Sequence, residues 1–305
     1  MTLRNVLVGA LAVASLAACG TSAPTADNGK IQVVASTNVW GSVVKAVGGD
    51  EVEVKALLDD PSADPHSYES KPADAALVKD AKLVVFNGGG YDDFFAKLIT
   101  SDATKKVEAF PLREHDHAEP STSAAPDADG HDHSVNEHVW YDLHTVQAVA
   151  EAAANELGAI APDKKSTFEK NTADFSAKLE ELEKKVAGIG TGKKVASTEP
   201  IAHYLVEESG AEDATPEEFS KAIEEESDVP AAALAAMNQL VEGKQVNVLV
   251  NNTQTENQVT KGLVEKAKSA GVPVVAVTET LPEGVTGYLD WMSKQVDALS
   301  QALKA

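Results

Sequence analysis

Cysteine is almost absent from this sequence. Its 305 residues contain a single cysteine, Cys19. An intrachain disulfide is therefore excluded, and so is a zinc site built from several thiolates, because both need at least two thiols. Any metal that this chain binds has to be held by histidine, carboxylate or other oxygen ligands.

Long hydrophobic runs are missing as well. The longest apolar stretch, residues 6–14, follows the basic Arg4 and is too short to span a bilayer as a helix. It leads into Leu16-Ala17-Ala18-Cys19, which resembles a bacterial lipobox. We therefore expect a lipoprotein signal peptide over residues 1–18 and an acylated Cys19 that anchors an extracytoplasmic protein to the cell membrane. The alternative is a cleaved signal peptide with an incidental cysteine.

Basic residues are scarce relative to acidic ones. The sequence has 26 Lys and Arg against 48 Asp and Glu, which gives a formal net charge of −22. Such a surface repels nucleic acids and anionic lipid headgroups, and it attracts cations. We therefore do not expect this protein to bind nucleic acid.

The common catalytic motifs are also missing. The sequence contains neither His-Glu-x-x-His nor Gly-x-Ser-x-Gly. Asn87-Gly88-Gly89-Gly90 lacks the Lys-Ser/Thr pair of a phosphate-binding loop, so it is interpreted as a strand-to-helix turn. These absences argue against an enzyme, although a metallohydrolase is kept as an alternative class alongside a surface adhesin.

Strand and helix patterns alternate along most of the chain. This alternation predicts an α/β fold in which parallel-rich sheets carry helices on both faces. A long amphipathic pattern from Pro162 to about Val186 is typical of a rigid spine helix between two halves. The expected organisation is a tether at residues 19–30, an N-terminal lobe at 31–160, the spine at 161–190 and a C-terminal lobe at 191–305.

Histidine is concentrated in one acidic stretch without apolar periodicity, residues 114–137. We expect this stretch to form a surface loop that is disordered without metal. Imidazole is a common zinc ligand, and a flexible chain can wrap several imidazoles around one ion. Auxiliary zinc capture is therefore predicted for the four loop histidines, His115, His117, His131 and His133; the alternative is a low-complexity tether without specific binding.

Two further histidines lie in short, distinctive motifs. His66 lies in Asp64-Pro65-His66-Ser67-Tyr68-Glu69, directly after a predicted strand, and Pro65 restricts the backbone before it. His138 is followed by the apolar Val139 and Trp140, which are expected to anchor it in a core. Glu137 or Asp142 is expected to orient its second ring nitrogen. Both histidines are predicted metal ligands; the alternative is a pair of ordinary loop histidines.

These motifs, in this order, resemble the metal-binding lipoproteins of zinc and manganese ABC importers, the cluster A-I family. The resemblance covers nearly the whole chain after the tether, and it includes the spine and the segment from Glu226 to Pro230. It implies that one metal ion lies between the lobes, with two ligands from each lobe. It further implies an ABC permease as partner, and a protein that acts as a monomer.

The resemblance also indicates the two ligands of the second lobe. It points to Glu199, at a position where family members carry His or Glu, and to Glu279, where the family usually has Asp. His203, one helical turn after Glu199, is a rival donor, and a water molecule could replace Glu279. The expected cargo is Zn(II), with Mn(II) as the alternative, because Glu199 favours manganese and the histidine-rich loop favours zinc.

Overall fold

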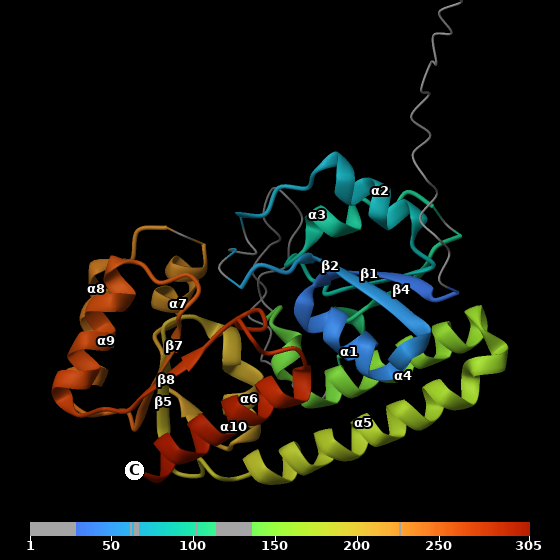
Figure 1. Ribbon diagram of the computed structural model, residues 1–305. Helices are drawn as coiled ribbons and strands as arrows, with labels where there is room; N and C mark the ends of the chain where they lie inside the picture. The colour runs from blue at the N-terminus through green and yellow to red at the C-terminus, as the bar shows by residue number, and fades with distance from the viewer. Residues whose placement is uncertain (1–28, 62, 64–66, 102, 114–135, 226) are drawn as a thin grey trace, which may run out of the picture.

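The computed structural model describes two lobes that lie side by side, each built around a four-stranded sheet (Figure 1). All strand pairs in both sheets are parallel. The described residues are 29–61, 63, 67–101, 103–113, 136–225 and 227–305. The predicted α/β fold of two lobes with parallel sheets is therefore confirmed.

The N-terminal sheet has the strand order β2-β1-β3-β4. Its strands are β1 (Ile31–Thr37), β2 (Val52–Leu58), β3 (Leu83–Phe86) and β4 (Lys105–Glu108). Helices α1 (Asn38–Gly48) and α4 (Leu143–Ile160) cover one face, and α2 (Pro72–Asp80) and α3 (Asp93–Ala96) cover the other. Val33 packs into the first of these layers and Val34 into the second, because successive side chains of a strand point to opposite faces.

The C-terminal sheet repeats this arrangement with the order β6-β5-β7-β8. Its strands are β5 (Lys194–Ser197), β6 (Glu212–Asp213), β7 (Val248–Asn252) and β8 (Val274–Val277). Its helices are α6 (His203–Glu208), α7 (Glu217–Glu224), α8 (Ala231–Glu242), α9 (Gln258–Ala270) and α10 (Tyr288–Lys304). Helices α7, α8 and α9 share a core with one face of the sheet, and α6 and α10 pack on the opposite face.

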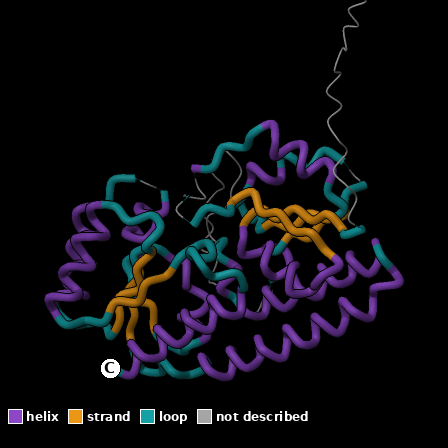
Figure 2. Tube along the Cα trace, viewed as in Figure 1, coloured by secondary structure: helices purple, strands orange, loops and turns teal. Residues whose placement is uncertain are grey.

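The predicted spine is a 3-10 turn at Pro162–Lys164 followed by α5 (Lys165–Val186), which runs beneath both lobes (Figure 2). One stripe of α5 is buried: Phe168, Thr172, Phe175, Leu179, Leu182 and Val186. A single apolar cluster extends from Val33 in the first sheet, through this stripe, to Val250 in the second. Because close-packed cores resist deformation, this shared core opposes large independent movements of the lobes. The lobe boundaries given above stay a prediction.

Four elements, β4, α3, β6 and α7, span only two to eight residues. Segments this short are too brief for a periodic pattern in the sequence to predict them. Among the described residues, no helix combines the length and the apolar character that a membrane span requires. The predicted signal peptide, Cys19, His66 and the four loop histidines lie outside the described residues.

Candidate metal centre

Three polar side chains lie just beyond the carboxyl ends of neighbouring strands in the C-terminal sheet. Glu199 follows β5, Asn252 ends β7, and Glu279 follows β8. Parallel strands end at the same edge of a sheet, so these side chains converge there. Both carboxylates are almost fully buried, with exposed fractions of 5% for Glu199 and 1% for Glu279.

The amide of Asn252 joins the two carboxylates. Its Nδ2 donates to Glu199 Oε2 at 2.9 Å and to Glu279 Oε1 at 3.0 Å. The orientation of this amide is fixed, because Asn252 Oδ1 accepts a hydrogen bond from the backbone N–H of Gln254 at 3.0 Å. One neutral donor therefore holds two buried acidic side chains next to each other.

The remaining oxygens of this carboxylate pair also accept from neutral groups. Thr255 Oγ1 donates to Glu199 Oε1 at 2.5 Å, and the Tyr91 hydroxyl donates to Glu279 Oε2 at 3.0 Å. Burial, followed by the negative charge of Glu279, raises the pKa of Tyr91 well above its ordinary value, so this phenol stays protonated. These hydroxyl donors orient the two carboxylates, and a pair of carboxylates brought together in this way is suited to bind a cation.

His138 is also buried, with an exposed fraction of 1%. Asn136, two residues earlier, determines which nitrogen of the His138 ring carries the proton. Asn136 Nδ2 donates to the Pro200 carbonyl at 2.6 Å, and its Oδ1 accepts from the His138 backbone N–H at 2.8 Å. Since these two bonds fix Oδ1 as the acceptor, His138 Nδ1, which lies 2.9 Å from it, has to carry the proton. Nε2 then carries the lone pair with which this ring would bind a metal ion.

Asn136 was missed by the sequence analysis, which assigned the orienting role to Glu137 or Asp142. The structure contradicts the assignment for Asp142, which caps α4 by accepting hydrogen bonds from the His144 backbone N–H and the Thr145 hydroxyl. An Asn side chain commonly bonds to the backbone two residues further on, and that local pattern could have identified Asn136.

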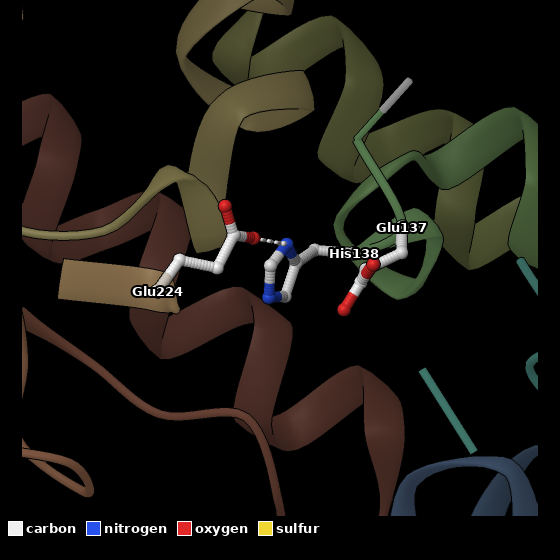
Figure 3. Close-up of side chains that lie close together, drawn as sticks. All are labelled: Glu137, His138 and Glu224. Atoms are coloured by element: carbon white, nitrogen blue, oxygen red, sulfur yellow. Dashed lines mark ion pairs between the residues drawn. The ribbon is translucent and has the colours of Figure 1, made fainter. Parts of the chain in front are cut away.

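Glu137, His138 and Glu224 form a second group of potential ligands (Figure 3). One ligand atom from each lies within 4.8 Å of the others; within the described part of the chain, no other group of three such side chains is as close. Glu224 Oε1 is 3.9 Å from His138 Nδ1, the nitrogen that Asn136 also contacts. Glu224 therefore faces the protonated side of the ring and is better suited to orient His138 than to bind the same ion.

The loop that carries His66 is tied to this site at Ala63. Gln254 Nε2 donates to the Ala63 carbonyl at 2.6 Å, and Gln254 Oε1 accepts from the backbone N–H of Glu279 at 3.0 Å. The structure thus brings the segment before His66 beside the Glu279 loop. His66 itself lies outside the described residues, so its role stays a prediction.

The two other histidines of the described chain have contacts of their own. His203 begins α6 and its ring packs edge-on against Tyr204, with the centroids 5.4 Å apart. His144 Nδ1 lies 3.6 Å from Glu183 Oε1 near the start of α4, and half of the His144 side chain is exposed. His144 is therefore a suitable control residue for experiments on His138.

Replacing Asn136 by alanine is expected to lower metal affinity by about 10–100-fold, the usual cost of losing a residue that orients a metal-binding histidine. Asn136→Asp keeps an acceptor for His138 Nδ1 and is expected to retain most of the affinity. Calorimetric titration with Zn²⁺ measures both variants. If Asn136→Ala and Asn136→Asp lost equal affinity for Zn²⁺, the contact between residue 136 and His138 Nδ1 would not be what supports metal binding.

The sequence of this chain matches a known protein family and several of its relatives. Residues 33–302 match the family model described as zinc-uptake complex component A, periplasmic. The zinc-binding lipoprotein AdcA of Streptococcus pneumoniae is 25% identical over 320 residues, which cover 97% of this chain and 60% of AdcA. The chain thus spans about 60% of the length of AdcA, which is less than two thirds.

Two further proteins are similar over most of their length. The iron ABC transporter substrate-binding lipoprotein MtsA of Streptococcus pyogenes is 28% identical over 254 residues, 75% of this chain and 80% of MtsA. The solved structure of the substrate-binding protein FpvC of Pseudomonas aeruginosa, in complex with Mn²⁺, has a TM-score of 0.68 and 19% identity. The superposition covers 90% of this chain and 98% of the FpvC chain, and this likeness shows a shared fold.

Proposed function

The chain belongs to the family of periplasmic zinc-uptake complex component A, and from this premise we propose that it captures one transition-metal ion between its lobes and delivers it to an ABC permease. The proposed cargo is Zn(II), with Mn(II) as the alternative. The function is capture and release, and no chemical step on a substrate is involved.

The observation that supports this proposal most strongly is the Asn252 bridge. Two buried carboxylates, Glu199 and Glu279, share one amide donor, and the hydroxyls of Thr255 and Tyr91 donate to their other oxygens. Buried charges are costly unless they are paired or bind a metal. A divalent cation stabilises such a pair far more than neutral hydrogen bonds do.

The proposed ligands are His66, His138, Glu199 and Glu279. Two imidazoles and two carboxylates form a mixed set that suits zinc and also accepts manganese. Related proteins carry names that differ in the metal: AdcA is zinc-binding, MtsA is an iron transporter component, and FpvC was solved with Mn²⁺. The proposal therefore keeps Zn(II) as the cargo and Mn(II) as the alternative.

The N-terminus and the histidine-rich loop have supporting roles in this proposal. We infer that the acylated Cys19 keeps the protein at the membrane surface, where it acts as a monomer. We also infer that the loop histidines supply weaker, auxiliary zinc sites.

Delivery of the ion to the permease requires that the lobes release it. Because the two lobes share one core along α5, we propose that they adjust only modestly when the ion enters. Docking on the permease would then distort the ligand set and release the ion.

Deleting this protein is expected to reduce uptake of zinc, or of manganese, when the medium is depleted of the metal. Uptake of ⁶⁵Zn and ⁵⁴Mn by the deletion strain measures the effect. Wild-type protein supplied in trans is expected to restore uptake, and a His138→Ala variant is not. Normal uptake by the starved deletion strain would count against the proposal.

A further inference from the structure

One hydrogen bond reaches across the two lobes directly to a proposed ligand. Tyr91 belongs to the loop after β3 in the N-terminal lobe, and Glu279 belongs to the loop after β8 in the C-terminal lobe. The Tyr91 hydroxyl donates to Glu279 Oε2 at 3.0 Å, and both side chains are buried.

The position of the Tyr91 hydroxyl is set by its own lobe. The Asp92 carboxylate accepts from the backbone N–H groups of Asn87 and Gly88 at 2.7 and 2.8 Å, which fixes the turn that carries Tyr91. The Tyr91 ring packs against Trp140, with the centroids 4.5 Å apart, and faces His138 at 6.0 Å. The Tyr91 hydroxyl is therefore a donor with a fixed position, and the Glu279 carboxylate has to adopt the position that this donor sets.

The Glu279 carboxylate accepts one hydrogen bond from each lobe. Its Oε1 accepts from Asn252 of its own lobe at 3.0 Å, and its Oε2 accepts from Tyr91 of the other lobe at 3.0 Å. An aspartate at this position would be shorter by one C–C bond, about 1.5 Å. With the backbone unmoved, it could not keep both contacts at hydrogen-bond distance, so the length of the glutamate side chain matches the separation of its two donors.

We infer that Tyr91 is a positioning residue for metal capture: it fixes the Glu279 carboxylate relative to His138 and makes this chain dependent on glutamate at position 279. The inference rests on the proposed function, because it assumes that Glu279 binds the ion. A carboxylate fixed in advance loses less freedom when a metal arrives, and the affinity is correspondingly higher.

The alternative is that Tyr91 simply helps to hold the lobes together. Other contacts already do this. Tyr141 donates to the Thr278 carbonyl at 2.9 Å, and Tyr288 donates to the Trp140 carbonyl at 2.7 Å. Asn38 exchanges two hydrogen bonds with the backbone of Leu281, at 2.9 and 3.3 Å. The position of the lobes is therefore over-determined without Tyr91.

Tyr141 offers a matched control. Like Tyr91, it is a buried tyrosine of the N-terminal lobe whose hydroxyl donates across to the segment around Glu279, but its acceptor is a backbone carbonyl. Tyr91→Phe and Tyr141→Phe each remove one hydroxyl and one such bond. Only the first change removes a hydrogen bond to a carboxylate oxygen of a proposed ligand.

The experiment measures Zn²⁺ and Mn²⁺ affinity by calorimetry for the purified wild type, Tyr91→Phe and Tyr141→Phe, together with the thermal midpoint of each protein without metal. Tyr91→Phe is expected to weaken binding of both ions by about 10–100-fold, and Tyr141→Phe by less than about threefold. The two thermal midpoints are expected to fall by similar amounts, because each variant loses one buried hydrogen bond.

A double-mutant cycle with Glu279→Asp completes the test. Aspartate cannot keep both contacts, and the contact with Tyr91 of the other lobe is the one expected to be lost, because Asn252 lies in the same lobe as position 279. Adding Tyr91→Phe to Glu279→Asp is then expected to cost less than about threefold further. Equal affinities for Tyr91→Phe and Tyr141→Phe, or full additivity in the cycle, would overturn the inference while leaving the proposed function intact. A wild-type protein that binds neither ion would overturn the proposed function, and the inference with it.

Discussion

Metal affinity is expected to fall by on the order of a hundredfold or more when His138 is replaced by alanine. Four-ligand zinc sites bind with apparent free energies of about 10–16 kcal/mol, or roughly 3 kcal/mol per ligand, and about 1.4 kcal/mol corresponds to a factor of ten. The His138 ring is buried, and its Nδ1 is already engaged by Asn136. No rearrangement of the neighbouring backbone would easily supply another nitrogen donor at that place.

The control for this prediction is His144→Ala. His144 lies six residues further along the chain, half exposed and 3.6 Å from Glu183. Its removal is expected to leave the affinity within about twofold of wild type, since a surface substitution away from a site rarely changes its energetics by more than about 0.5 kcal/mol. Competition against a chromogenic zinc chelator measures both variants. Similar affinities for the two variants would remove His138 from the ligand set.

Replacing Glu199 by glutamine is expected to weaken Mn²⁺ binding by on the order of a hundredfold, and Zn²⁺ binding by less. Manganese prefers charged oxygen ligands, whereas zinc binds well to the imidazoles that remain. Glutamine has nearly the same size as glutamate, so the packing volume is kept, but its Nε2 cannot accept one of the two hydrogen bonds that Asn252 and Thr255 donate to Glu199. Parallel calorimetric titrations with the two metals measure the difference.

Two further substitutions decide whether Glu199 acts as a ligand. Glu224→Gln removes the carboxylate that lies 3.9 Å from His138 Nδ1. This carboxylate faces the protonated side of the ring, so we expect Glu224→Gln to weaken metal binding less than Glu199→Gln does. Glu256→Gln removes a carboxylate that accepts a hydrogen bond from Asn251, outside the proposed site, and is expected to leave both affinities unchanged. A larger loss for Glu224→Gln than for Glu199→Gln would move the ion to the group of Glu137, His138 and Glu224.

The strand ends of the C-terminal lobe were predictable from the sequence, and for a physical reason. Glu199 and Glu279 each follow a short strand with two buried apolar residues, Val195 and Ala196 in β5 and Val275 and Val277 in β8. Parallel strands have their carboxyl ends at one edge of the sheet. The same rule, applied to β7, would have added Asn252, which ends the strand between the other two in space. Asn252 was overlooked because an amide is not a usual metal ligand, although an amide can hold two ligands in place.

Tyr91 could not have been predicted in this way. Its role depends on the relative placement of two lobes, which comes from the shared core along α5 and from contacts such as that between Tyr288 and Trp140. The pattern of a single chain segment carries no information about such placement. The local amide contact between Asn136 and His138, by contrast, spans two residues and was within reach of sequence reasoning.

Elemental analysis shows whether this chain holds one metal ion by His138 and its neighbours. The purified protein is dialysed against limiting Zn²⁺ and Mn²⁺ together, and the bound metal is then counted. We expect one tightly held ion per wild-type chain, none in His138→Ala, and one in His144→Ala. A wild-type protein that retains neither metal, or a His138→Ala variant that retains its ion, would show that His138 does not hold such an ion.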